Sequence, residues 1–267
     1  MTNKPLLSLA IAIGSLTFSA TASAQNLLPK PQSFTPGKGM FSTSATGYRV
    51  VNEAGADAEN IYSKPWIAKN NDKARQVVLF KRLRANGKVS PEAYRLHVTG
   101  DSIVISAASA DAFRYAWQTI AQLTTKKGIV ACDIQDAPAY KWRSLMLDVS
   151  RHFFPIEFLK KQIDVMAQYK FNRFHIHLTD AAGWRIEIKR YPRLTNFAAW
   201  RPNRTWKEWN NTGNQYVAEG TEGAYGGYYT QDQLRDLVKY AAERGITIVP
   251  EIEMPGHSEE VLSLIHI

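Results

Sequence analysis

The sequence predicts an α/β protein in which an N-terminal α+β accessory domain is followed by the first part of a TIM (β/α)8 barrel, incomplete in this chain. In the first half, strands that alternate polar and apolar residues precede an amphipathic helix. In the second half, short apolar strands alternate with helices, and each strand ends in ionisable residues. Ionisable residues at the carboxyl ends of several strands are typical of barrel enzymes.

Residues 1–24 have the features of a secretory signal peptide. Lys4 supplies a positive charge, residues 6–18 are mostly apolar but too few to span a membrane, and residues 22–24 form a small-residue cleavage site. We therefore expect an exported protein, periplasmic or secreted, whose mature chain begins near Gln25 and contains no membrane span.

The overall charge does not indicate a nucleic-acid partner. The chain has 33 Lys and Arg against 24 Asp and Glu, a formal net charge of +9. These basic residues are scattered, so we interpret them as a solvated surface and expect no nucleic acid to bind. Cys132 is the single cysteine, which excludes a disulfide within the chain, and its apolar neighbours predict a buried thiol.

The first domain, residues 25–136, is predicted from a hairpin and a helix. Residues 93–98 and 102–106 alternate polar and apolar side chains, and Thr-Gly-Asp forms the turn between them. Residues 111–123 then place their apolar side chains on one helical face. Strands covered by a helix indicate an α+β layer, and no catalytic motif stands out in it.

The second domain, residues 137–261, is predicted to be a series of βα units. Successive strand and helix signals pack onto a parallel sheet, and the lack of a Gly-rich loop after the first strand argues against nucleotide binding. The expected elements are a strand at 144–149, a helix at 155–169, a strand at 172–178, a long segment at 181–229, a helix at 230–245 and a strand at 246–252.

Polar residues gather where each of these strands ends. His175 and His177 lie two apart, so their side chains point to the same side. The pair predicts either a hydrogen-bonded cluster or a metal site, because imidazole suits Zn, Fe or Ni, and a metal-dependent hydrolase therefore stays an alternative. The residues concerned are Asp148 and Arg151, then His175, His177 and Asp180, then Glu251, Glu253 and His257.

The long segment at 181–229 is unusual for a compact domain and is rich in aromatic residues. On top of a barrel such residues can stack on sugar rings, although packing of the segment itself is the simpler interpretation for each one. Asp148 and Arg151 leave a similar choice open, because their spacing fits a structural ion pair as well as a functional one. The aromatic residues are Trp184, Trp200, Trp206, Trp209, Tyr216, Tyr225, Tyr228 and Tyr229.

From Trp142 onward the chain resembles glycoside hydrolase family 20, the β-N-acetylhexosaminidases. Five blocks occur in the family's order, and the first domain, with Asn-Leu-Leu-Pro-Lys-Pro at 26–31, resembles the family's accessory domain. The blocks are WRSLMLDVSRHFFP at 142–155, KFNRFHIHLTD at 170–180, GWRIE at 183–187, GGYYT at 226–230 and VPEIEMPGH at 249–257.

The resemblance implies an exo-acting β-N-acetylhexosaminidase that removes terminal non-reducing β-linked GlcNAc or GalNAc from glycans. It implies substrate-assisted retaining catalysis, with the sugar's 2-acetamido group as nucleophile and without metal or cofactor. By the same resemblance, Arg143 binds the outer hydroxyls of the sugar, and His177 belongs to the substrate-binding residues. Asp180 and His257 form a relay that supports the catalytic acid. Glu253 takes a supporting position where many members have Asp.

Two departures from the family pattern limit this expectation. Asp180-Ala181-Ala182 stands where the family often has Asp-Asp-Gln, and the family's adjacent Asp-Glu pair has no counterpart in the 267 residues. We therefore expect an N-terminal fragment that is inactive by itself, and a non-catalytic glycan-binding protein is a further alternative. We interpret residues 262–267 as a non-native tail, with native sequence ending near Val261.

Overall fold

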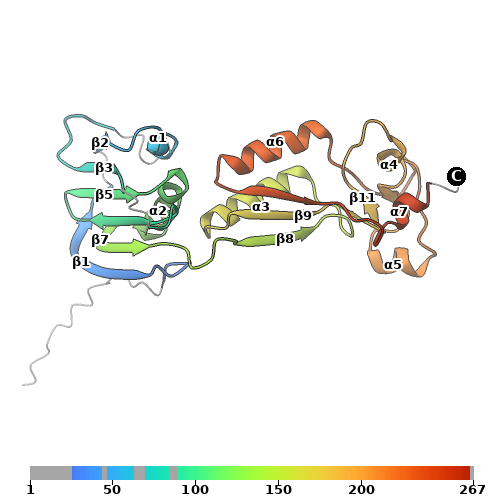
Figure 1. Cartoon of the computed structure of the whole chain (residues 1–267), viewed down its shortest axis with the longest axis horizontal. Coiled ribbons are helices and arrows are strands. Elements are labelled where there is room, and N and C mark those ends of the chain that lie inside the picture. Colours follow the sequence, from blue (N-terminus) through green and yellow to red (C-terminus); the bar gives the residue numbers. More distant parts are fainter. Residues whose placement is uncertain (1–25, 44–46, 63–69, 84–88, 265–267) are drawn as a thin grey trace, which may run out of the picture.

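A computed structural model of the chain shows two α/β units placed end to end (Figure 1). The predicted signal peptide, residues 1–24, lies outside the described residues, as do residues 265–267. No helix in the described part of the chain is long and apolar enough to cross a membrane. The structure describes residues 26–43, 47–62, 70–83 and 89–264.

The first unit is a seven-stranded sheet in the order β1-β7-β4-β5-β3-β2, with the short β6 paired to β7. The predicted hairpin is confirmed, since β4 and β5 pair antiparallel with Leu96 opposite Ile105. The elements are β1 Ser33–Phe41, β2 Arg49–Asn52, α1 Ala56–Tyr62, β3 Val77–Arg82, β4 Tyr94–Val98, β5 Ser102–Ala107, α2 Ala110–Leu123, β6 Thr124–Thr125 and β7 Gly128–Asp136.

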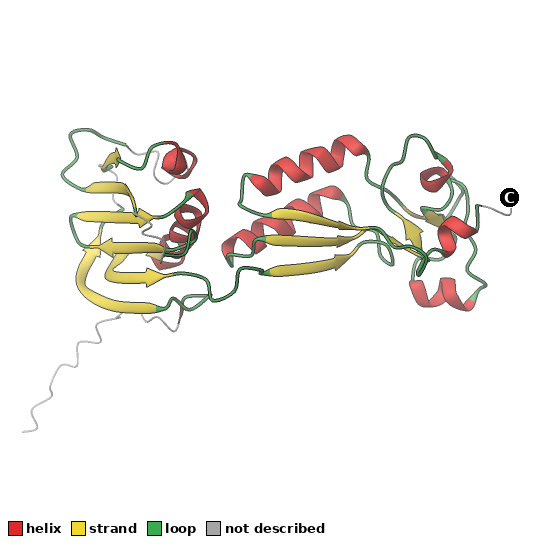
Figure 2. Cartoon of the chain, in the orientation of Figure 1, coloured by secondary structure: helices red, strands yellow, loops and turns green. Residues whose placement is uncertain are grey.

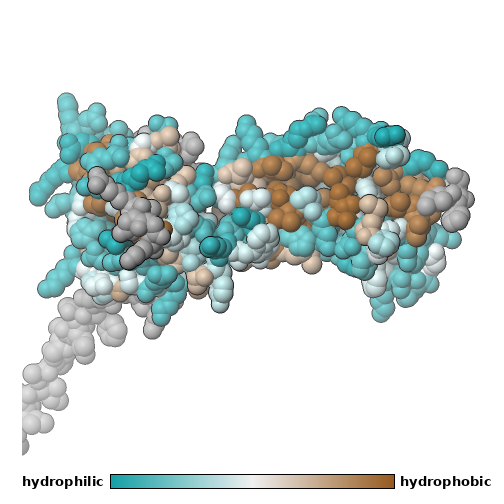
Figure 3. Space-filling model, in the orientation of Figure 1, coloured by the Kyte–Doolittle hydropathy of each residue, from teal (hydrophilic) through white to brown (hydrophobic). Residues whose placement is uncertain are grey.

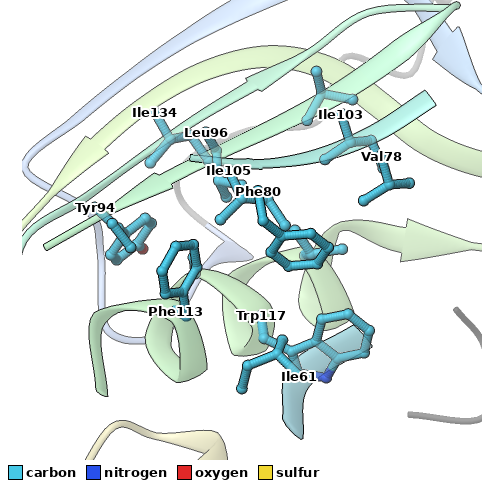
Figure 4. Close-up of a cluster of buried hydrophobic side chains, with 14 of the residues drawn as sticks. Ile61, Val78, Phe80, Tyr94, Leu96, Ile103, Ile105, Phe113, Trp117 and Ile134 are labelled. Atoms are coloured by element: carbon cyan, nitrogen blue, oxygen red, sulfur yellow. The ribbon is translucent and has the colours of Figure 1, made fainter. Parts of the chain in front are cut away.

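Side chains of α2 form the core of this unit against the sheet (Figure 4). The helix begins after Ser109, whose hydroxyl oxygen accepts a hydrogen bond from the Ala112 amide. Phe113 and Trp117 are buried on its sheet-facing side. Cys132 is buried as predicted, and burial raises the pKa of its thiol to about 11, so the thiolate needed for reactivity does not form at neutral pH.

The second unit begins with three parallel strands in the order β14-β9-β8, with α3 and α6 beside them (Figure 2). The predicted helices are confirmed, and Thr230 caps α6 in a capping box with Gln233. Three strands do not close a barrel, so the described residues contain the predicted partial α/β region. Its elements are β8 Ser144–Asp148, α3 Ile156–Gln168, β9 Arg173–His177, α6 Gln231–Ala242 and β14 Thr247–Glu251.

The two faces of this sheet differ. Because alternate residues of a strand point to opposite sides, Phe174 and Ile176 are buried toward the helices, whereas Met146 on the other face is exposed. Figure 3 shows apolar residues gathered over this unit. Further along the strands, the same face as Met146 carries Asp148 and His177, which lie opposite each other in register.

Between β9 and α6 the chain builds a loop region at the carboxyl ends of the strands (Figure 1). Two buried arginines hold it together, and in the described structure the hydrogen bonds of Arg185 and Arg201 go to backbone carbonyls. Burial lowers the pKa of Arg185 to about 10. The short elements here are β10 Thr179–Asp180, β11 Gly183–Trp184, α4 Arg193–Asn196, β12 Trp200–Arg201, α5 Trp206–Asn211 and β13 Tyr225–Gly226, and α7 Glu259–Leu262 follows β14.

Ion pairs join the two units at the opposite, amino ends of the strands. Lys170, just before β9, donates to the Tyr94 hydroxyl at 2.8 Å and pairs with Asp136 at 3.1 Å. Arg143, just before β8, pairs with Glu92 at 2.7 Å. The first unit is therefore fixed at the end of the sheet that lies away from the loop region.

Candidate active site

The carboxyl ends of the three strands bring acidic and imidazole groups together. The parallel register places His177 of β9 between Asp148 of β8 and Glu251 of β14. All three side chains leave the sheet on the face opposite the helices, because residues in register on neighbouring strands point the same way. The cluster thus follows from strand alignment and not from proximity in the sequence.

His177 bridges two carboxylates. Its Nε2 lies 3.0 Å from Asp180 Oδ2, and its Nδ1 lies 2.8 Å from Glu251 Oε2. Burial alone would lower the pKa of His177, but these two hydrogen bonds outweigh it and raise the pKa above the ordinary value of 6.5. Both ring nitrogens of His177 thus contact carboxylates. The assignment of His177 to the substrate-binding residues stays a prediction.

Asp180 is the centre of the cluster. Its side chain is only 3% exposed, and nitrogen atoms of three side chains face one oxygen, Oδ2. Arg151 Nη2 lies at 2.6 Å, His177 Nε2 at 3.0 Å and His257 Nδ1 at 3.4 Å. A buried carboxylate is tolerable only with such partners.

Arg151 belongs to this cluster. Its guanidinium lies 2.6 Å from Asp148 Oδ2 and 2.6 Å from Asp180 Oδ2, yet the side chain remains 38% exposed. Asp148 also accepts the backbone amides of Ser150 and Arg151, which fixes the turn after β8. The open choice for this pair resolves geometrically: the ion pair exists, and it holds an exposed guanidinium at the site.

The structure brings His257 to Asp180, as the relay prediction requires. His257 follows a Met-Pro-Gly turn, adopts the left-handed region at φ 52°, and remains 54% exposed. Its ring stands edge-on to that of His177, with centroids 6.4 Å apart. Glu253 lies nearby, where its backbone amide donates to the Thr179 hydroxyl at 2.8 Å. The roles of these residues in catalysis stay predictions.

Arg143 does not reach the site, which corrects the prediction that it binds the sugar. It precedes β8, so the length of a five-residue strand, on the order of 15 Å, separates it from the carboxyl end. Its guanidinium donates hydrogen bonds to Glu92, the Tyr115 hydroxyl and the Lys170 carbonyl. The two arginines differ already in the sequence, since Arg151 follows the strand and Arg143 precedes it.

A metal ion has one candidate ligand set among the described residues. Donor atoms of His177, Glu251 and Glu253 lie within 4.8 Å of one another. His175 Nε2 also contacts Glu251, at 2.7 Å. These groups already pair with one another, and a cation would have to displace the hydrogen bonds between His177 and Glu251. The metal-dependent alternative therefore keeps a defined set of residues on which to be tested.

Of the eight aromatic residues predicted to lie in the loop region, three are buried, four are half-buried and one is exposed. Trp184, Trp209 and Tyr229 are buried, whereas Trp206 is exposed. The Tyr225 hydroxyl contacts His152 Nδ1 at 2.9 Å. The simpler interpretation of this segment, that its aromatic side chains pack it against the sheet, is therefore the one that fits the three buried rings.

Parallel βα units with a charged cluster at the carboxyl ends of their strands define the barrel class of enzymes. Within that class, the chain belongs to glycoside hydrolase family 20. The model of the family's catalytic domain matches residues 140–265, and the model of its domain 2 matches residues 24–137.

Individual relatives agree with this assignment. A β-hexosaminidase of Vibrio furnissii is 37% identical over 90% of this chain and 39% of its own length. A crystal structure of an exo-β-N-acetylglucosaminidase from Vibrio harveyi in complex with N-acetylglucosamine matches with TM-score 0.74 and 35% identity, over 92% of this chain and 39% of that one. A β-N-acetylhexosaminidase of Bacteroides fragilis matches with TM-score 0.70 and 34% identity, over 90% and 47%. The chain thus spans about two fifths of the length of these relatives.

Proposed function

We propose that the protein containing this chain is an exo-acting β-N-acetylhexosaminidase, which hydrolyses terminal non-reducing β-linked GlcNAc or GalNAc from glycans. The observation that carries the proposal is the buried Asp180, placed beside His257 at the carboxyl ends of the strands in a member of this family. The names of the relatives, β-hexosaminidase and N,N'-diacetylchitobiase, support the same reaction and substrate class.

The geometry suggests how these residues contribute to retaining, substrate-assisted hydrolysis. The 2-acetamido oxygen of the sugar attacks the anomeric carbon while a general acid protonates the leaving oxygen. Asp180 holds Nδ1 of His257, which leaves Nε2 to hydrogen-bond the general acid and tune its proton affinity. In place of Arg143, we assign the contact with the sugar hydroxyls to Arg151, whose exposed guanidinium is preorganised by Asp148 and Asp180.

We further propose that the Asp-Glu pair of the family lies outside these residues, since no adjacent Asp-Glu occurs in the 267. In the family that Glu is the general acid and that Asp orients the acetamido group, so turnover requires them. We also propose export to the periplasm or the medium, on the basis of the signal-like residues 1–24.

The test is an assay of the full gene product on 4-nitrophenyl β-N-acetylglucosaminide and β-N-acetylgalactosaminide. We expect hydrolysis with retained anomeric configuration, followed by NMR of the first-formed sugar, and no loss of rate in EDTA. Loss of activity in EDTA that Zn²⁺ restores would favour the metal-dependent alternative at His177, Glu251 and Glu253. Glycan binding without hydrolysis would favour the non-catalytic alternative.

A further inference from the structure

Glu260, on α7, carries a buried carboxyl group. The residue is 0% exposed, and neither of its carboxylate oxygens is hydrogen-bonded to another of the described residues. Its neighbour Glu259 is exposed and accepts a hydrogen bond from the Asn214 side-chain amide at 3.1 Å. An ionised carboxylate is costly in the surroundings of Glu260, so the group is favoured in its protonated form.

The charged and titratable groups around Glu260 reinforce this preference. Burial, and less strongly the negative charges of Asp180 on β10 and Glu259 on α7, raise the pKa of Glu260 to about 7. Tyr216, from the loop region, is close enough for Glu260 to raise its pKa as well. Among the described groups that most affect Glu260, Arg185 is positively charged, but its N–H groups donate to backbone carbonyls and form no ion pair with Glu260.

α7 is continuous with the turn that carries His257. The Ser258 hydroxyl donates to two carbonyls of that turn, at 3.0 and 3.2 Å, so the turn and the helix form one piece. Val261 of the helix packs against the cluster that contains Trp184. The distance of 3.4 Å between His257 and Asp180 therefore depends on how α7 is seated.

We propose that Glu260 is a positioning residue: as a neutral carboxylic acid it keeps α7 seated and thereby keeps His257 beside Asp180. Ionisation draws the carboxylate toward water, loosens α7 and separates His257 from Asp180. The structural part of this inference stands without the proposed function, whereas its effect on turnover rests on that function.

The first test is hydrogen exchange detected by mass spectrometry on the full gene product, with Glu260→Gln and the matched control Glu259→Gln. In the parent, after correction for intrinsic exchange, we expect the amides of residues 257–261 to exchange about tenfold faster at pH 8 than at pH 6, because that is the change in the ionised fraction around a pKa near 7. Glu260→Gln removes this increase, and Glu259→Gln keeps it. An increase of the same size in Glu260→Gln overturns the proposal.

The second test is the pH profile of kcat/KM, which a merely structural role would not move. We expect Glu260→Gln to extend activity to higher pH, and Glu260→Ala, which leaves a cavity, to lower it at every pH. A Gln variant with flat exchange but an unchanged alkaline limb overturns the positioning role. Glu260→Met, also neutral and of similar volume, replaces the Gln variant if that one does not fold. Because exchange needs no substrate, an inactive gene product would refute the proposed function and leave this inference to the exchange data.

Discussion

The two ends of the same parallel strands carry similar ion pairs with different consequences. At the amino ends, Arg143 and Lys170 are almost enclosed, and their partners Glu92 and Asp136 belong to the first unit. At the carboxyl ends, Arg151 pairs with carboxylates yet keeps more than a third of its side chain exposed. One end joins two units, and the other presents charged groups to solvent.

This difference between the two ends shows that an ion pair does not by itself mark a functional site. A functional site is marked by side chains that are held by an ion pair and still have hydrogen-bond donors accessible to solvent. The guanidinium of Arg143 donates its hydrogen bonds to Glu92, Tyr115 and a backbone carbonyl. Arg151 and His257 are each fixed by Asp180 while part of each side chain remains accessible. Fixed orientation together with exposure is the arrangement that can bind a substrate group without reorganisation.

Removal of the charge of Asp180, at the carboxyl ends of the strands, should have the largest effect on activity. We expect Asp180→Asn to lower kcat/KM of the full gene product by at least about 100-fold, the scale of general acid catalysis, because His257 and Arg151 both lose the anion that orients them. The measurement is steady-state hydrolysis of the nitrophenyl glycoside across a range of pH.

The matched control is Asp136→Asn, at the amino ends of the strands where the two units are joined. It removes the charge that faces Lys170, and we expect the free energy of unfolding to fall by about 2 kcal/mol with kcat/KM of the folded protein unchanged. Equal losses of kcat/KM in the two variants would contradict the idea that the carboxyl ends of the strands serve activity and the amino ends serve stability.

Replacement of each arginine by Met tests the same difference between the two ends of the strands, with a smaller expected effect. Arg151→Met should raise KM and lower kcat/KM roughly 10-fold, the value of one charge-assisted hydrogen bond to the sugar. Arg143→Met should leave KM unchanged and lower the free energy of unfolding by about 3 kcal/mol, because Glu92 is left half-buried without its cation. Urea unfolding and substrate kinetics on both variants measure this, and a KM effect from Arg143→Met would restore the family-based assignment.

The elements of the fold were predictable from the sequence because their signals are local. The hairpin of β4 and β5 follows from alternation, and α3 and α6 from helical periodicity and caps. The short strands and helices between β9 and α6 were not predictable, since they depend on Arg185 and Arg201, which collect carbonyls from distant parts of the chain. Such long-range hydrogen bonds leave no periodic pattern.

The site was predictable in part. Register follows once parallel strands are recognised, so Asp180 and His257 could be expected near each other. The error at Arg143 arose because resemblance alone does not say which end of a strand a residue occupies. Glu260 could not have been found, because Ser258-Glu259-Glu260 reads as the polar start of a helix and burial of its second Glu is set by the loop region.

The smallest expected effect is a pH dependence of the free energy of unfolding that arises from His177. Burial would lower the pKa of His177, but the hydrogen bonds to Asp180 and Glu251 raise it, so the folded value lies above the unfolded value of about 6.5. The stabilisation is therefore complete below that unfolded value and is lost as pH rises through the folded pKa. His177→Gln should remove it, so the difference in free energy of unfolding between parent and variant should shrink from pH 6 upward.

The measurement is urea unfolding at several pH values in the Glu260→Gln background. That background is needed because the raised pKa of Glu260 also lowers stability as pH rises, between its unfolded value of 4.5 and about 7. Lys170→Met at the amino ends of the strands is the control, because it removes an ion pair that contains no histidine, and we expect its effect to change less with pH. A difference for His177→Gln that is constant with pH would mean that folding does not shift the pKa of His177, and a difference that grows with pH would mean that the fold favours the neutral imidazole.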